Sequence, residues 1–151
     1  MIYLDHNATT PLHPRAFEAM VPYLCERWGN PSSLYRFGSE ARAAVERARG
    51  RLAEAVGCEP GELVFCSSGT ESDNLALRGV VRALSSRGDR IVTTAIEHPA
   101  VRNTCQALER EGHRITSLPV DRDGVVELAA LRASLDAGTI LVTIMHANNE
   151  T

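Results

Sequence analysis

The stretch ELVFCSSGTESDNLAL, residues 62–77, changes character in its middle. It begins with an apolar run typical of a β-strand and ends in a sequence with the periodicity of a helix. Thr70 and Asp73 fit the Ser/Thr-x-x-Asp/Glu pattern found at helix starts. We therefore predict a strand, a tight turn and a helix, with Ser68, Gly69 and Thr70 at the N-terminus of the helix.

The same alternation of strand and helix patterns continues along the chain. Runs rich in β-branched residues are separated by stretches with helical periodicity, and glycines follow where helices should end. The further predicted strands are RIVTTA at 90–95, RITSLPV at 114–120 and TILVTIMHA at 139–147; the predicted helices lie near 70–86, 99–111 and 127–136. This order predicts an α/β fold, in which a mainly parallel sheet carries helices on both faces.

The run at 139–147 is apolar almost without interruption, so we expect a central strand that is buried on both faces. One side of that strand would remain unpaired in this sequence, which predicts an incomplete domain. Two further helices are expected near 14–27 and 39–56. The expected organisation is an N-terminal segment with helices over 1–60 and an incomplete large domain over 61–151.

The composition narrows the class of protein. The chain has 151 residues, is 44% hydrophobic and carries a formal charge of -3, with arginines scattered between acidic residues. This balance predicts a globular core and no nucleic-acid or membrane partner. No apolar stretch is long enough to span a bilayer, and the first residues lack the order of a signal peptide, so we expect a cytoplasmic protein.

The cysteines and basic residues give two further constraints. The four cysteines are widely spaced, with no CxxC pair and no histidine cluster, so we expect packed thiols and neither a disulfide nor a metal site. All sixteen basic residues are arginine. The chain therefore has no side-chain amine.

Three polar clusters follow predicted strands. They contain Thr70, then His98 in AIEHPAV, then Asn148 and Asn149 in HANNET. Because parallel strands end at the same edge of a sheet, we expect the clusters to face one crevice. The free N–H groups of a helix that starts at Gly69 favour a phosphate there. A purely structural interpretation stays open for each: a helix cap, an ordinary residue at a helix start, and an asparagine turn.

Five motifs make the sequence resemble a known family. IYLDHNATTPLHP, GNPSSLYRFG, VFCSSGTESDNLAL, TTAIEHPAV and VTIMHANNET occur in the order and at the spacing of cysteine desulfurases of the NifS and IscS type. These are class V aminotransferase-like enzymes that depend on pyridoxal 5'-phosphate. The resemblance covers the whole sequence and the N-terminal part of the family. It implies part of the large domain of an aspartate aminotransferase-type (fold type I) enzyme.

The resemblance also implies roles for particular residues. Gly69 and Thr70 match the positions that hold the cofactor phosphate, and His98 matches the histidine that stacks on the pyridine ring. Asn149 matches the asparagine that bonds the phenolic oxygen of the cofactor and helps to place the substrate carboxylate. Tyr35 stands where many relatives have histidine.

The activity implied by the resemblance is conversion of L-cysteine to L-alanine. The sulfur leaves as an enzyme persulfide for iron–sulfur cluster and thio-cofactor assembly, and the implied partners are a second copy in a homodimer and sulfur-acceptor or scaffold proteins. The lysine, aspartate and loop cysteine of the family lie beyond the aligned region. We therefore expect no catalytic residue here and no activity from this chain alone. The alternatives are a selenocysteine lyase, a class V aminotransferase, or a non-catalytic phosphate-binding or interaction protein.

Overall fold

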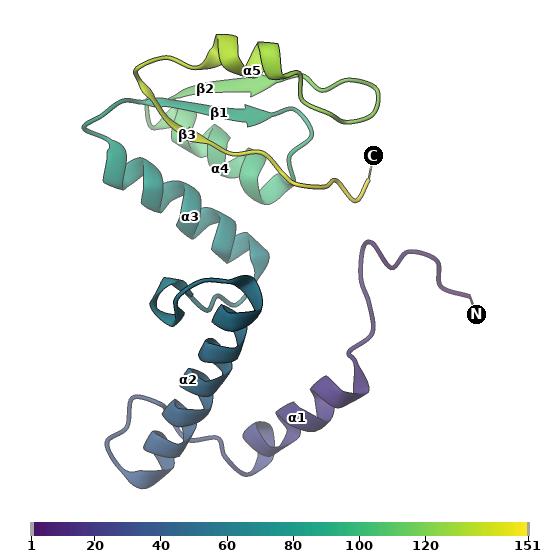
Figure 1. The fold of residues 1–151 in the computed structure, drawn as a ribbon, viewed down its shortest axis with the longest axis vertical. Coiled ribbons are helices and arrows are strands. Elements are labelled where there is room, and N and C mark those ends of the chain that lie inside the picture. Colours follow the sequence, from purple (N-terminus) through teal and green to yellow (C-terminus); the bar gives the residue numbers. More distant parts are fainter. Residues whose placement is uncertain (1, 151) are drawn as a thin grey trace. The chain divides into compact units, whose positions relative to one another are not determined.

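The computed structural model describes residues 2–150, which form two compact units divided between Phe65 and Cys66 (Figure 1). The first unit contains α1 (Pro14–Cys25), α2 (Arg36–Val56) and the 3-10 helix η1 (Pro60–Glu62). The second unit contains α3 (Gly69–Leu84), β1 (Arg90–Thr94), α4 (Pro99–Arg110), β2 (Arg114–Leu118), α5 (Leu128–Ser134) and β3 (Thr139–Val142).

The two long helices of the first unit begin and end at residues suited to those positions. Pro14 opens α1, where its fixed φ is favourable, and the side chain of His13 accepts a bond from the Arg15 amide. Gly57 ends α2 in the left-handed conformation at φ 75°, and its amide donates to Ala53. Glycine adopts this conformation without the clash that a side chain would cause.

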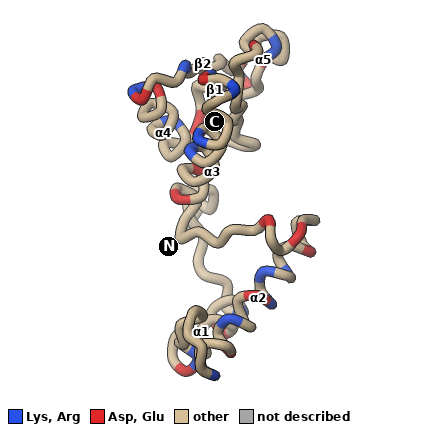
Figure 2. Tube along the Cα trace, turned by 90° about the vertical axis from the view of Figure 1, so that its left-hand side faces the viewer, with Lys and Arg blue, Asp and Glu red and all other residues tan. Residues whose placement is uncertain are grey.

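The second unit is built on a three-stranded parallel sheet in the order β2-β1-β3. Ile91 in β1 lies opposite Ile115 in β2 and Leu141 in β3. Helices α4 and α5 lie on opposite sides of the strands (Figures 1 and 2). The α/β fold with a parallel sheet is therefore confirmed.

The strand predicted over 139–147 is shorter and less buried than expected, and it lies at the edge of the described sheet with one side unpaired, as the sequence predicted. The central strand is β1, whose Ile91 and Val92 are fully buried, whereas β3 lies at the edge of the described sheet and ends at Val142. Val142 is 42% exposed. The last backbone bond to the sheet runs from the Thr143 amide to the carbonyl of Val92.

The predicted strand ELVFC at 62–66 is also wrong, because this segment lies outside the sheet. Its start is the last residue of η1, and the carbonyl of Leu63 accepts a 2.6 Å bond from the Arg49 guanidinium of α2. The same guanidinium lies 4.7 Å from the centre of the Phe65 ring. The apolar run therefore packs against α2 instead of joining β1.

The core of the second unit lies between one face of the sheet and the helices α3 and α4. Its buried members are Leu77 and Val81 of α3, Ile91 of β1, and Val101, Cys105 and Leu108 of α4. Leucine and valine four residues apart place the buried stripe of α3 against α4.

Neither unit has a described helix that is long and apolar enough to cross a membrane. Basic and acidic residues are interspersed along the described chain (Figure 2).

Candidate functional site

The N-terminus of α3 is capped by Ser68, and not by Thr70 as the sequence pattern predicted. Ser68 keeps an extended backbone, and its hydroxyl accepts a 3.2 Å bond from the Glu71 amide. One carboxylate oxygen of Glu71 in turn accepts 2.6 Å bonds from the amide and the hydroxyl of Ser67. The capping motif is therefore displaced by two residues, because Thr70 already has helical geometry.

This arrangement leaves donors available at the start of α3. The amides of Gly69 and Thr70 and the Thr70 hydroxyl have no hydrogen-bond acceptor among residues 2–150. A Cβ atom built on Gly69 would meet no other atom within 4 Å, so the backbone is open to an approaching group. Free N–H groups and the positive end of the helix dipole together favour an anion at this position.

Glu71 brings a negative charge to the same helix start. The hydroxyl and amide of Ser67, which both donate to its carboxylate, hold the pKa of Glu71 below its usual value. The carboxylate is thereby committed to Ser67, and the donors of Gly69 and Thr70 remain without a protein partner.

His98 is the N-cap residue of α4, as the structural interpretation of this residue expected. Its Nδ1 atom accepts a 3.1 Å bond from the Ala100 amide. An accepting Nδ1 carries no proton, so this bond selects the tautomer with hydrogen on Nε2 and fixes the plane of the ring. The imidazole therefore keeps one orientation while Nε2 and the ring faces stay open to a ligand.

Two neighbouring cavities place His98 between the other predicted residues. A cavity of about 320 Å³ is lined by His98 together with Thr70 and Arg78. A second cavity of about 290 Å³ is lined by His98 together with Asn149. Gly69 lines neither cavity but precedes Thr70 in the first turn of α3. The structure thus brings the three predicted polar clusters together, with His98 shared by both cavities.

The two asparagines after β3 have different environments. The amide group of Asn148 donates to the carbonyl of Ile96 at 2.9 Å, and its oxygen accepts a 2.6 Å bond from the Glu150 amide. These bonds give Asn148 a structural role, but the left-handed backbone of the turn interpretation is absent, because no described residue other than glycine has a positive φ. The side chain of Asn149 is exposed and has no hydrogen bond to the other described residues. Its oxygen and nitrogen remain available.

Asn74 and Thr104 connect the two helices that carry Thr70 and His98, and the sequence reasoning missed both residues. The Thr104 hydroxyl lies 2.8 Å from the side-chain oxygen of Asn74 and 2.8 Å from the carbonyl of Ala100. The Asn74 amide group donates to the carbonyl of Thr70 at 2.9 Å. The interhelical contact joins residues 30 positions apart, which no local pattern reveals.

Glu97 was missed as well. This acidic side chain is only 5% exposed, and one of its oxygens accepts bonds from the Thr94 hydroxyl at 3.0 Å and the Met145 amide at 2.8 Å. The available signal was a charged residue three positions after the end of β1 and directly before His98.

The prediction that all four cysteines are packed is wrong for Cys25, which is exposed at the end of α1. Cys58 and Cys66 are partly buried. Cys105 is buried in the core, and this burial raises the pKa of its thiol. Among residues 2–150, no group of three or more metal-binding side chains is placed to hold an ion.

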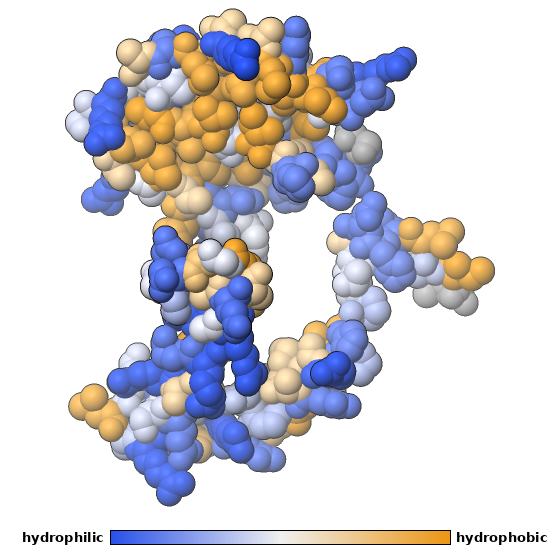
Figure 3. Space-filling model, in the orientation of Figure 1, coloured by the Kyte–Doolittle hydropathy of each residue, from blue (hydrophilic) through white to orange (hydrophobic). Residues whose placement is uncertain are grey.

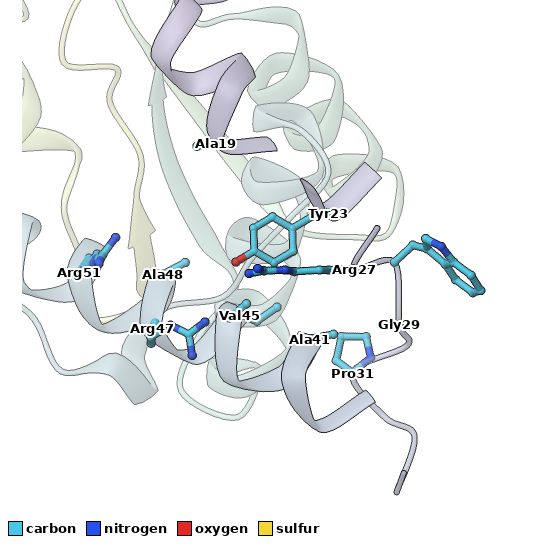
Figure 4. A pocket seen from close by; sticks show the side chains of 12 residues that line it. Ala19, Tyr23, Arg27, Gly29, Pro31, Ala41, Val45, Arg47, Ala48 and Arg51 are labelled. Carbon is cyan, nitrogen blue, oxygen red and sulfur yellow. The ribbon is translucent and has the colours of Figure 1, made fainter. Parts of the chain in front are cut away.

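A larger cavity of about 690 Å³ lies in the first unit, between α1 and α2. Figure 4 shows the side chains of Tyr23 and Arg27 facing those of Val45 and Ala48. The lining consists of apolar, aromatic and arginine side chains, with no carboxylate, imidazole or thiol among them. An imidazole and carboxylates line the cavity that His98 shares with Asn149 instead, from His98, Glu97 and Glu150.

The sequence pattern of the class-V aminotransferases matches residues 2–151, and the chain belongs to this family. It is 51% identical to the cysteine desulfurase IscS of Dictyoglomus turgidum, over 99% of this chain and 38% of that protein. A solved structure described as a NifS-like protein is 42% identical, with a TM-score of 0.95 over 99% of this chain and 41% of that one.

A second solved structure, described as SspA in complex with cysteine, is 34% identical with a TM-score of 0.91, over 98% of this chain and 43% of that one. The structural matches confirm the predicted fold over the matched length. The chain spans roughly two fifths of the length of these relatives.

Proposed function

We propose that this chain is the N-terminal, cofactor-holding part of a cysteine desulfurase that depends on pyridoxal 5'-phosphate. The reaction converts L-cysteine to L-alanine and passes the sulfur to the enzyme as a persulfide. The observation that carries the proposal is the position of His98, which lines one cavity with Thr70 and the other with Asn149. The identity of 51% to a cysteine desulfurase supports the choice of reaction.

The residues around His98 fit the three parts of the proposed cofactor. The unpartnered donors of Gly69 and Thr70 suit a phosphate dianion at a helix N-terminus. The fixed ring of His98 suits a flat aromatic surface. The exposed amide of Asn149 suits a phenolic oxygen that accepts a hydrogen bond.

Pyridoxal phosphate, when bound, supplies an electron sink for a carbanion at the α-carbon of the substrate. In this proposal Gly69 and Thr70 bind the phosphate, and His98 holds the plane of the ring through its bond to Ala100. Asn149 donates to the phenolic oxygen and orients the substrate carboxylate. The chain has no lysine, so its own residues hold the cofactor without a covalent bond.

The proposal extends to the wider setting implied by the family resemblance. Residues 61–151 contribute to the large cofactor-binding domain, and residues 1–60 precede it with their helices. The complete enzyme acts as a homodimer in the cytoplasm and delivers sulfur to acceptor or scaffold proteins. This sulfur supply serves the assembly of iron–sulfur clusters and thio-cofactors.

A chimeric enzyme tests the proposed function. This chain replaces the matching N-terminal part of the Dictyoglomus turgidum cysteine desulfurase, and the formation of alanine and sulfide from L-cysteine is measured. We expect activity in the chimera, and a strong loss when His98→Ala is introduced into it. A folded chimera that binds pyridoxal phosphate but releases neither product would overturn the proposal. The unmodified relative serves as the positive control.

A further inference from the structure

The proposed function leaves the buried carboxylate of Glu97 without a role. A charged side chain that is 5% exposed is costly unless hydrogen bonds compensate for the lost water. No ion pair involves Glu97 among the described residues. Its carboxylate instead accepts hydrogen bonds from two neutral donors, the Thr94 hydroxyl and the Met145 amide.

The two donors belong to segments far apart in the sequence. Thr94 is the last residue of β1, whereas Met145 lies in the segment after β3, 48 residues beyond Glu97. The sheet no longer holds this segment, because its last ladder bond is made by Thr143. Beyond that point, the 143–149 segment is tied to the 95–98 turn by the Glu97–Met145 bond and by the Asn148–Ile96 bond.

We propose that Glu97 is a positioning residue that sets the place of Asn149 relative to His98. Its carboxylate holds the Met145 amide, and so fixes the 143–149 segment against the turn that carries His98. This bond acts together with the Asn148–Ile96 bond, and it is the one made by a buried side chain directly beside His98 in the sequence. The contacts that position Asn149 are all made within this chain. Only the identity of the ligand between His98 and Asn149 rests on the proposed function.

Three variants separate the effect of the length of the Glu97 side chain from the effect of its hydrogen-bond acceptor. Glu97→Gln keeps an oxygen acceptor at the same distance, Glu97→Asp keeps the charge but shortens the side chain, and Glu97→Ala removes the acceptor. Glu109→Ala, on the exposed side of α4, is the matched control. If Glu97→Ala does not fold, the comparison of Glu97→Asp with Glu97→Gln carries the test.

The first measurement is amide hydrogen exchange by NMR on the whole chain. We expect the Met145 amide to exchange about tenfold faster or more in Glu97→Ala and Glu97→Asp, relative to the amide of Val92 in the centre of the sheet. In Glu97→Gln and Glu109→Ala the same ratio should stay within about threefold of the wild-type ratio. Equal acceleration of Met145 and Val92 would mean that Glu97 serves overall stability, and no acceleration would mean that it holds nothing; either result overturns the proposal.

The second measurement uses pyridoxal phosphate as the probe. In Glu97→Ala and Glu97→Asp we expect the shifts that it induces at the Thr70 amide to persist, while those at the Asn149 side-chain amide are lost; Glu97→Gln should restore them. Unchanged shifts at Asn149 in these variants would overturn the positioning role. If the probe moves no signal in the wild-type chain, the proposed function fails, whereas the Met145 exchange still decides the role of Glu97.

Discussion

At the scale of single residues, the start of α3 shows how two hydroxyl side chains take different tasks. The Ser68 hydroxyl accepts a hydrogen bond from the Glu71 amide, whereas the Thr70 hydroxyl has no partner among the described residues. The capping residue and the candidate phosphate-binding residue are thus two positions apart. This separation allows the binding role of Thr70 to be tested without removing the cap.

Replacement of Thr70 by valine is expected to weaken pyridoxal phosphate binding by about 1.5 to 3 kcal/mol, as for the loss of a hydrogen bond to a charged group. The free energy of unfolding should change little, because Thr70 does not cap the helix. Titration of the cofactor by fluorescence and thermal unfolding measure the two effects. The control, Ser68→Ala, should lower stability by about 1 kcal/mol. Unchanged cofactor affinity together with a lower melting temperature in Thr70→Val would show that Thr70 serves the helix.

The contact between Glu71 and Ser67 is expected to depend on pH. The pKa of Glu71 in the folded chain lies below its usual value of 4.5, because Ser67 donates two bonds to the ionised form. The stabilisation is therefore fully present above pH 4.5 and is lost as the pH falls through the lowered folded pKa. The Ser67 amide shift in an NMR titration should follow this loss. Glu71→Gln should remove the transition, and its persistence would assign it to another group.

At the scale of elements, a close approach of two turns aligns the strands at the end opposite the candidate site. The amides of Asp89 and Arg90 both donate to the carbonyl of Gly138, at 3.1 and 2.9 Å. The Arg114 guanidinium bonds Asp89 at 2.6 Å and Asp136 at 3.3 Å. The turns before β1 and β3 are thereby held together, so the carboxyl ends of these strands reach His98 and Asn149 in a defined register.

Gly88→Ala is expected to disturb this alignment. A Cβ atom on Gly88 would overlap the backbone carbonyl of Gly138, which cannot move without breaking its bonds to the start of β1. Strain of this kind costs about 1 to 3 kcal/mol, which chemical denaturation can measure. The matched control is Gly79→Ala inside α3, where a Cβ meets nothing within 4 Å and stability should rise by up to about 1 kcal/mol. Equal stability of the two variants would contradict this account of the turns.

At the scale of the whole molecule, the absence of lysine limits how the chain can hold a carbonyl compound. All sixteen basic residues are arginine, so no side chain of this sequence carries an amine that could form a Schiff base. Treatment with pyridoxal phosphate and borohydride should therefore leave no adduct on any internal peptide. Mass spectrometry of a protease digest is the measurement. A labelled internal peptide would contradict the expectation, and a lysine-containing protein treated alongside provides the positive control.

The edge of the sheet at β3 gives a prediction about association. Hydrophobic side chains gather on the face of the second unit along which β3 runs (Figure 3), and Val142 and Ile144 are 42% and 40% exposed. Exposed apolar edge strands pair with strands of other molecules. We expect concentration-dependent oligomers in light scattering coupled to size exclusion, and fewer of them for Val142→Lys. A monodisperse wild-type monomer at all concentrations would rule out association through this edge.

Local patterns were sufficient for most helices and for the order of the elements. Apolar periodicity located α4, and Gly57 and Gly112 marked true helix ends. These features depend on residues within a few positions of one another, and so the sequence alone determines them. The polar residues Thr70, His98 and Asn149 were identified in the same way, from their places after predicted strands.

The tertiary structure decided which segments pair and which side chains support the site. The run at 62–66 is as apolar as a strand, but Arg49 holds it against α2, and only contacts distant in sequence settle that choice. The same reason applies to Glu97, whose partner Met145 is 48 residues away. A single contact between a carboxylate and a distant backbone amide produces no periodic pattern in the sequence. The position of Asn149 beside His98 can therefore be seen only in the folded chain.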